Sequence, residues 1–269
     1  MGETGDKKER DAARLVRGGA TMLAGSVLVD SAMEHYRGSF TNPAMTLPLV
    51  ASSALIAFNA TDAGGEGPRA ATHGAALAIG LAGLGFHLFN VGKRPGSASF
   101  TNFFYGAPVG APGALLLAGA VSALADGLKR DQRAIGPVKL GSGRAAGALA
   151  AFGIAGTVAE AGLLHLRGAF HDPFMWAPVT LPPIAAASLA VDVIRARPSR
   201  ISYGLLGATV LLGFIGVGFH SWGVARNMGG WRNWRQNLLA GPPIPAPPAF
   251  TGLALVGLAA LLLMGRKRD

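Results

Sequence analysis

Long apolar runs alternate with short polar and basic segments along most of the chain. A bilayer-crossing helix needs about 20 mostly apolar residues, and helix is the expected conformation because a helix satisfies its own backbone hydrogen bonds in lipid. The pattern predicts eight such helices, of which the fourth and eighth are the shortest. They are approximately Leu15–Met33, Pro43–Ala60, His73–Val91, Ala111–Ala125, Ala145–Leu166, Pro178–Ile194, Ile201–Trp222 and Pro248–Met264.

A fourteen-residue motif occurs twice, at His35–Pro48 and His165–Pro178, and seven of its fourteen positions are identical at a constant offset of 130 (165 − 35). Further matches join Gly83–His87 to Gly216–His220 and Asn102–Pro112 to Asn237–Pro247. Such internal matches predict a tandem duplication. We expect an all-α integral membrane protein with two four-helix repeats of the same orientation. They are residues 1–128 and 145–269, joined by a basic cytoplasmic linker at 129–144.

The distribution of charged residues along the chain decides how the net charge of +10 should be interpreted. Only 14% of the residues are charged, against about 25% in a soluble domain. The basic residues cluster between the apolar runs, as in cytoplasmic loops of membrane proteins, so we exclude a nucleic-acid partner. We predict a bacterial inner membrane protein with both termini cytoplasmic. The predicted cytoplasmic clusters lie at 7–17, 129–144, 195–200 and 266–268.

Four of the six histidines belong to the repeated segments and form two pairs, His35 with His87 and His165 with His220. Each pair lies near the outer ends of two helices that run in the same direction. Inward-facing imidazoles at one level of a bundle can ligate a planar cofactor. Because the chain has no cysteine, the pairs favour b-type haem over iron–sulfur clusters or c-type haem. Two haems are therefore expected.

Residues near the histidines extend this hypothesis. Arg37 and Arg167 follow their histidines by two positions and are predicted to pair with haem propionates at the water boundary. Small residues allow close approach, so we expect four glycines to leave room for the macrocycle. These are Gly83, Gly85, Gly216 and Gly218.

Two acidic residues, Asp30 and Glu160, precede His35 and His165 by five positions. Carboxyl groups inside a membrane are costly, which indicates a role. They are candidates for orienting a histidine, for carrying protons, or for joining the histidines in a non-haem metal site. An inter-helical hydrogen bond that fixes packing is an equal alternative.

The functional hypothesis is a cytochrome b-like electron-transfer subunit that exchanges electrons with a quinone or a periplasmic redox partner. No common enzyme signature occurs, so we expect a non-catalytic subunit of a membrane redox complex. A non-haem metal protein, and a non-redox scaffold or transporter subunit, are the alternatives. Four residues in one outer segment are predicted to dock the partner: Trp231, Arg232, Trp234 and Arg235.

Overall fold

The computed structural model describes residues 3–61, 64–129, 134–135 and 140–265, and most of them are helical. All eight predicted apolar segments lie in helices. These long helices are α1 (Glu3–Arg37), α2 (Leu47–Ala60), α3 (Glu66–Gly92), α5 (Gly110–Lys129), α6 (Ser142–Arg167), α7 (Ala177–Arg195), α8 (Arg200–Ala225) and α10 (Pro248–Met264).

Shorter elements connect the long helices. The sequence pattern did not predict the α-helices α4 (Phe100–Tyr105) and α9 (Trp234–Ala240), or the 3-10 turns η2 (Pro173–Trp176) and η3 (Gly230–Asn233). The 3-10 turn η1 (Pro43–Thr46) forms the start of the second predicted apolar segment. In the predicted linker, β1 (Ala134–Ile135) pairs antiparallel with β2 (Leu140–Gly141). The rest of the linker at 130–133 and 136–139, and the basic cluster at 266–268, lie outside the described residues.

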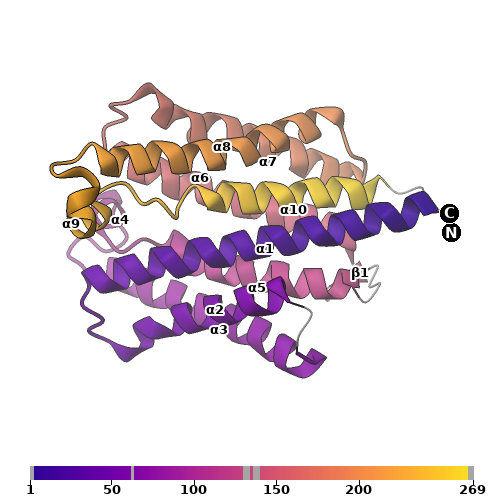
Figure 1. The fold of residues 1–269 in the computed structure, drawn as a ribbon, viewed down its shortest axis with the longest axis horizontal. Helices are drawn as coiled ribbons and strands as arrows, with labels where there is room; N and C mark the ends of the chain where they lie inside the picture. Colours follow the sequence, from indigo (N-terminus) through magenta and orange to yellow (C-terminus); the bar gives the residue numbers. More distant parts are fainter. Residues whose placement is uncertain (1–2, 62–63, 130–133, 136–139, 266–269) are drawn as a thin grey trace.

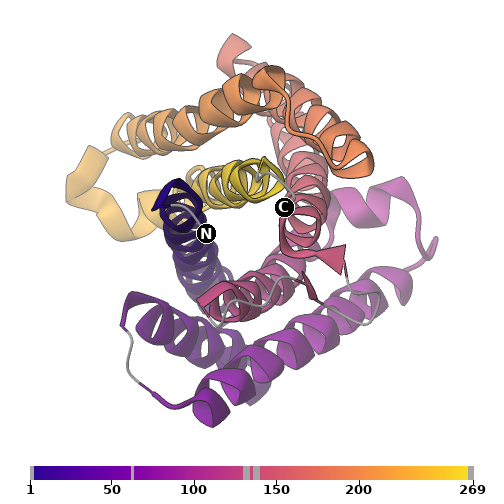
Figure 2. The ribbon, with the colours of Figure 1, turned by 90° about the vertical axis from the view of Figure 1, so that its right-hand side faces the viewer.

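Four helices form the centre of the molecule. Helices α1, α10, α6 and α5 contact one another in a ring, while α2 and α3 cover α1 and α5, and α7 and α8 cover α6 and α10 (Figure 2). The fourth and eighth apolar segments lie in α5 and α10, which are buried by the other helices along most of their length.

Six described helical segments are long and apolar enough to cross a membrane. They comprise α3, α5, α6 and α8, together with α2 and α7 extended by their 3-10 turns. The outer helices carry large exposed apolar side chains, such as Phe86, Leu211 and Phe214. An apolar exterior of this kind faces lipid rather than water, and the architecture is that of an all-α membrane protein.

The two ends of the molecule differ. The start of α1, the end of α10 and the α7–α8 connection lie at one end, which we call the terminal end, and α4 and α9 lie at the opposite end (Figure 1). The terminal end carries the described basic residues of the 7–17 and 195–200 clusters. The end with α4 and α9 holds the repeated histidine motifs.

Candidate functional site: two histidine turns

The first motif forms a tight reversal after α1. Backbone N–H of Phe40 donates to the carbonyl of His35 (3.0 Å), and Ser39 N–H donates to Tyr36 (2.9 Å). Ser39 and Phe40 both have positive φ angles, 56° and 47°. Non-glycine residues seldom adopt this left-handed conformation, so the two consecutive left-handed residues are a specific feature of the motif.

The second motif makes the same reversal after α6. Phe170 N–H donates to the carbonyl of His165 (3.1 Å) and Ala169 N–H to Leu166 (2.8 Å). Ala169 and Phe170 have φ angles of 55° and 48°. The phenylalanine ring also lies edge-on to the histidine ring in both turns, with centroids 6.1 Å apart for His35–Phe40 and 6.0 Å for His165–Phe170.

The remaining repeated positions stabilise the turns. The Asn42 side chain accepts a hydrogen bond from Ala44 N–H (2.9 Å), and Asp172 accepts one from Phe174 N–H (3.0 Å). Both caps precede a proline that begins a 3-10 turn. A β-carbon at Gly38 or Gly168 would lie 3.1 or 3.0 Å from the terminal methyl group of Met45 or Met175. The two methionines therefore pack on the turns.

Each turn fixes one nitrogen of its histidine. The Nδ1 atom of His35 lies 2.6 Å from the carbonyl oxygen of Met45, and that of His165 lies 2.9 Å from the carbonyl oxygen of Met175. A carbonyl oxygen can only accept a hydrogen bond, so Nδ1 carries the proton. In the neutral imidazole, Nε2 then has a free lone pair, which is the form of histidine that binds metals.

The partner histidines are held in the same way. Nδ1 of His87, on α3, hydrogen-bonds the carbonyl of Pro108, and Nδ1 of His220, on α8, bonds the carbonyl of Pro243 at 2.6 Å. Both acceptors precede the central helices α5 and α10. All four repeated histidines thus donate Nδ1–H to a backbone carbonyl. No hydrogen bond to any of their Nε2 atoms is found among the described residues.

The structure brings the histidines of each predicted pair into electrostatic range. His87 lies close enough to His35, and His220 close enough to His165, for a charge on one imidazole to affect the other. Each pair combines the end of a central helix, α1 or α6, with a covering helix, α3 or α8.

The predicted role of the glycines is wrong for two of them and unsupported for the others. A β-carbon at Gly83 would lie 3.2 Å from Pro112, and one at Gly216 would lie 2.7 Å from Pro247. These glycines let α3 and α8 approach the proline segments, so they leave no gap for a macrocycle. Gly85 and Gly218 are exposed and meet no atom within 4 Å, which places them on the outer surface.

The two arginines have protein partners. Arg37 forms an ion pair with Glu34 on the same helix. Arg167 donates to the carbonyl of Phe103 on α4 (3.3 Å), and its guanidinium lies 5.7 Å from the ring of Phe104. Both arginines are exposed at the end of the molecule where the motifs lie.

The two acidic residues lie at the interface between the two sets of helices, and their contacts differ. Glu160 accepts a hydrogen bond from the backbone N–H of Gly110 (3.1 Å), at the start of α5. This inter-helical contact is one of the predicted alternatives. Asp30 lies within electrostatic range of Glu160 and Glu34. In the sequence match, Gly110 corresponds to Pro245 (offset 135), which has no N–H to donate to Asp30.

No group of three or more His, Asp or Glu side chains that could hold a metal ion occurs in the part of the chain that the structure describes. The histidines form pairs, and Asp30 and Glu160 do not complete a larger ligand set with them. A metal site at either histidine pair would therefore draw two ligands from the described residues.

The predicted docking residues are exposed, with one qualification for Arg235. Trp231 and Trp234 are 51% and 58% exposed, and Arg232 is exposed beside them. The Arg235 guanidinium bonds the hydroxyl of Tyr36 and lies 5.5 Å from its ring. Arg235 therefore ties α9 to the end of α1, just as Arg167 ties α6 to α4.

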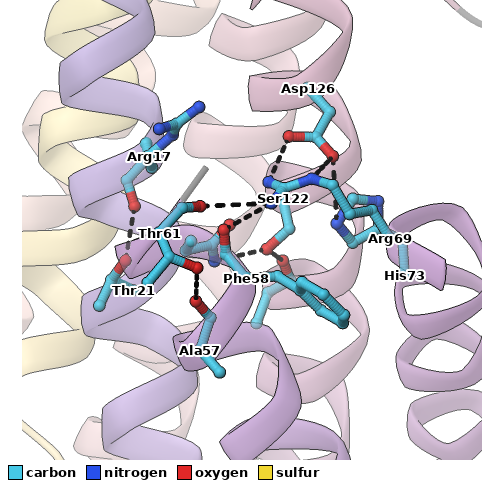
Figure 3. Close-up of polar contacts among 11 residues, drawn as sticks. Arg17, Thr21, Ala57, Phe58, Thr61, Arg69, His73, Ser122 and Asp126 are labelled. Atoms are coloured by element: carbon cyan, nitrogen blue, oxygen red, sulfur yellow. Dashed lines mark hydrogen bonds and ion pairs between the residues drawn. The ribbon is translucent and has the colours of Figure 1, made fainter. Parts of the chain in front are cut away.

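A buried ion pair was missed by the sequence analysis. Arg69 on α3 and Asp126 on α5 join through two hydrogen bonds, of 2.7 and 2.6 Å, and His73 lies beside them (Figure 3). The sequence feature that could have revealed this pair is the presence of single charged residues near the ends of apolar runs.

Comparison of the chain with protein-family models, with curated proteins and with solved structures finds no match.

Proposed function

We propose that the chain is an eight-span protein of the bacterial inner membrane, built from two tandem four-helix repeats, with both termini in the cytoplasm. Six helical segments satisfy the length and composition of a span. We assign α1 and α10 as the other two spans. The 17 residues of α10 would extend about 25 Å, and other helices cover it on most sides. The order of elements, with η1 and η2 after the first helix of each half, supports the duplication.

Each repeat, in this proposal, binds one b-type haem through its histidine pair, His35 with His87 and His165 with His220. The observation that carries the proposal is the hydrogen bond from Nδ1 of all four histidines to a backbone carbonyl. Metal-ligating histidines nearly always donate their other ring N–H in this way, because the bond fixes the tautomer and raises the basicity of the ligand.

The number of ligands favours haem over a non-haem metal ion. A porphyrin supplies four ligands to its iron, so two axial histidines complete the coordination. A non-haem ion in a closed protein site needs more protein ligands than two, and the described residues supply no group of three. The Nε2 atoms of the four histidines are suitable axial ligands for two haems. The predicted gap beside the glycines does not support haem binding, so the proposal rests on the histidine ligands.

The position of the histidines near the outer side of the membrane determines which electron-transfer role the protein would have. Bound haem would supply one-electron transfer near the outer side of the membrane. We propose exchange with a quinone or a periplasmic redox partner, with the exposed Trp231, Arg232 and Trp234 as the docking surface. The role is that of an electron-transfer subunit. In this role the histidine turns hold the ligands, and Arg37 and Arg167 lie exposed at the same end, where propionates would meet water.

A structural role is the second candidate, and one observation favours it. Most of the repeated residues in the turns already have partners within the protein, from the capping Asn42 and Asp172 to the packed Met45 and Met175. The histidine Nδ1 bonds also tie adjacent segments together. In a scaffold or transporter subunit these contacts would be the whole purpose of the motif.

An absorbance spectrum and the metal content of the purified protein separate the candidates. We expect iron and porphyrin in equal amounts, at two per chain. A bound metal without porphyrin would favour the non-haem alternative, and neither metal nor porphyrin in protein from haem-replete cells would favour the structural role.

A further inference from the structure

A buried polar cluster occupies the terminal end of the first set of helices, where α2, α3 and α5 meet (Figure 3). Arg69 and Asp126 are only 8% and 5% exposed. The Nη1 atom of Arg69 also donates to the carbonyl of Phe58 (2.7 Å) at the end of α2. Charged groups are rarely buried in a membrane protein unless they have a function.

Polar groups continue from this cluster toward the middle of the molecule. Asn59 on α2 donates its Nδ2 to the hydroxyl of Ser122 on α5 (2.9 Å), and Ser122 lies one turn before Asp126 on the same helix. Ser52 lies on the same face of α2, two turns or about 10.5 Å beyond Asn59. The polar side chains thus form a row that starts at the α2–α5 interface and continues along the buried face of α2, with the fully buried Leu55 between Asn59 and Ser52.

Two atoms in this row have no hydrogen-bond partner among the described residues. They are Oδ1 of Asn59 and Oγ of Ser52, on side chains that are 3% and 0% exposed. Nearly all buried polar atoms in proteins are hydrogen-bonded, to protein or to internal water. Internal waters typically bind groups of this kind.

The second set of helices shows that the packing does not require these polar groups. At the offsets of the sequence match, Asn59 corresponds to Leu189, His73 to Leu206 and Asp126 to Leu261. All three leucines are fully buried. A β-carbon at Gly257, the counterpart of Ser122, would lie 3.0 Å from Leu206 and 3.1 Å from Leu189. Apolar side chains thus fill the places of Asn59, His73 and Asp126, while Ser202, the counterpart of Arg69, bonds the hydroxyl of Ser188 (2.7 Å).

We propose that the row from Asp126 through Asn59 to Ser52 lines a hydrated path, which admits water and protons from the terminal end to the middle of the first four-helix set. Asp126 and His73 stand at its entrance, and the unpartnered oxygens of Asn59 and Ser52 bind the water inside. Arg69 is held by Asp126 and Phe58, so the path offers no open cationic site for an anion. The path does not depend on haem binding.

The absence of cysteine from the chain allows a direct test with single-cysteine variants. In sealed vesicles whose outer surface presents the terminal end of the protein, the reaction of Ser52→Cys with a small charged methanethiosulfonate reagent added outside is compared with that of Ala185→Cys. Ala185 is fully buried on α7, and by the offset of 130 it lies one turn nearer the terminal end than the counterpart of Ser52. Depth alone therefore predicts faster reaction at position 185.

We expect Ser52→Cys to react about tenfold faster than Ala185→Cys, because only a hydrated thiol ionises to the reactive thiolate. Ser122→Cys, a near-isosteric change on α5, should also react faster than the control. In the Ser52→Cys chain, the pair of changes Arg69→Met and Asp126→Leu should lower the rate to that of the control. Equal rates at positions 52, 122 and 185 in folded protein would overturn the proposal.

Discussion

The Nδ1 atom of His35 lies 2.6 Å from the carbonyl oxygen of Met45, ten residues further along the chain. The same bond, at 2.9 Å, joins His165 to Met175. Because both bonds close a turn that contains two left-handed residues, the orientation of each imidazole depends on the whole motif.

The caps Asn42 and Asp172 should stabilise the turns. Replacing either residue by Ala removes the acceptor for one backbone N–H, and the loss of such a cap costs about 1 kcal/mol. We expect a lower thermal midpoint in detergent for Asn42→Ala and for Asp172→Ala.

The natural control for the caps is the exchange Asn42→Asp, since Asp performs the same role in the second turn. This variant should keep the midpoint of the original protein. Similar losses for Asn42→Asp and Asn42→Ala would argue against a capping role.

Close contact between Gly110 and Glu160 should make position 110 intolerant of a side chain. A β-carbon at Gly110 would lie 2.9 Å from Oε2 of Glu160 and 3.0 Å from its Cδ. Because the carboxyl group would have to move and lose its bond to the Gly110 N–H, Gly110→Ala should destabilise the protein.

Gly113→Ala serves as the matched control, because a β-carbon at Gly113 meets no atom within 4 Å and Ala favours helix by about 1 kcal/mol over Gly. Thermal unfolding should place Gly110→Ala below the original protein and Gly113→Ala at or above it. The reverse order would show that α5 and α6 do not meet in this way.

The ion pair between Arg69 and Asp126 should be costly to break on one side only. Asp126→Leu leaves a buried guanidinium without its carboxylate, and removal of one partner from a buried pair costs about 3–5 kcal/mol. Replacing both residues, as Arg69→Met with Asp126→Leu, should restore most of the stability, because an apolar pair of similar volume can substitute for buried ions.

Leu261 supports the expected stability of the double variant, because it occupies the place of Asp126 in the second half and is fully buried. Chemical unfolding of the two single variants and the double variant gives the coupling energy directly. A double variant less stable than either single one would contradict this account.

Most of the helical architecture could be predicted from the sequence, because runs of apolar residues determine where helices can cross a bilayer. The positions of all eight long helices follow from such runs. The 3-10 turns η2 and η3 and the short helices α4 and α9 could not be predicted, since they depend on caps such as Asp172 and on contacts such as Arg235 with Tyr36.

For the site, the duplication identified the four histidines that share an Nδ1 bond to a backbone carbonyl, but not their surroundings. Matching positions led to the pairing of His35 with His87, whereas the role of Gly83 depends on a proline of another helix, Pro112. The Arg69–Asp126 pair was missed for a related reason: the two residues lie 57 positions apart, occur in one half only, and so leave no repeat signal.

The haem content of histidine variants tests the central claim most directly. Purified protein should carry two haems per chain, His35→Ala and His165→Ala one each, and the variant with both changes none, because each turn supplies an axial ligand to a separate site. His171→Ala is the control, since this exposed histidine has no counterpart in the repeat, and it should keep both haems. Unchanged haem content in the double variant, or no haem in the original protein from haem-replete cells, would contradict the account.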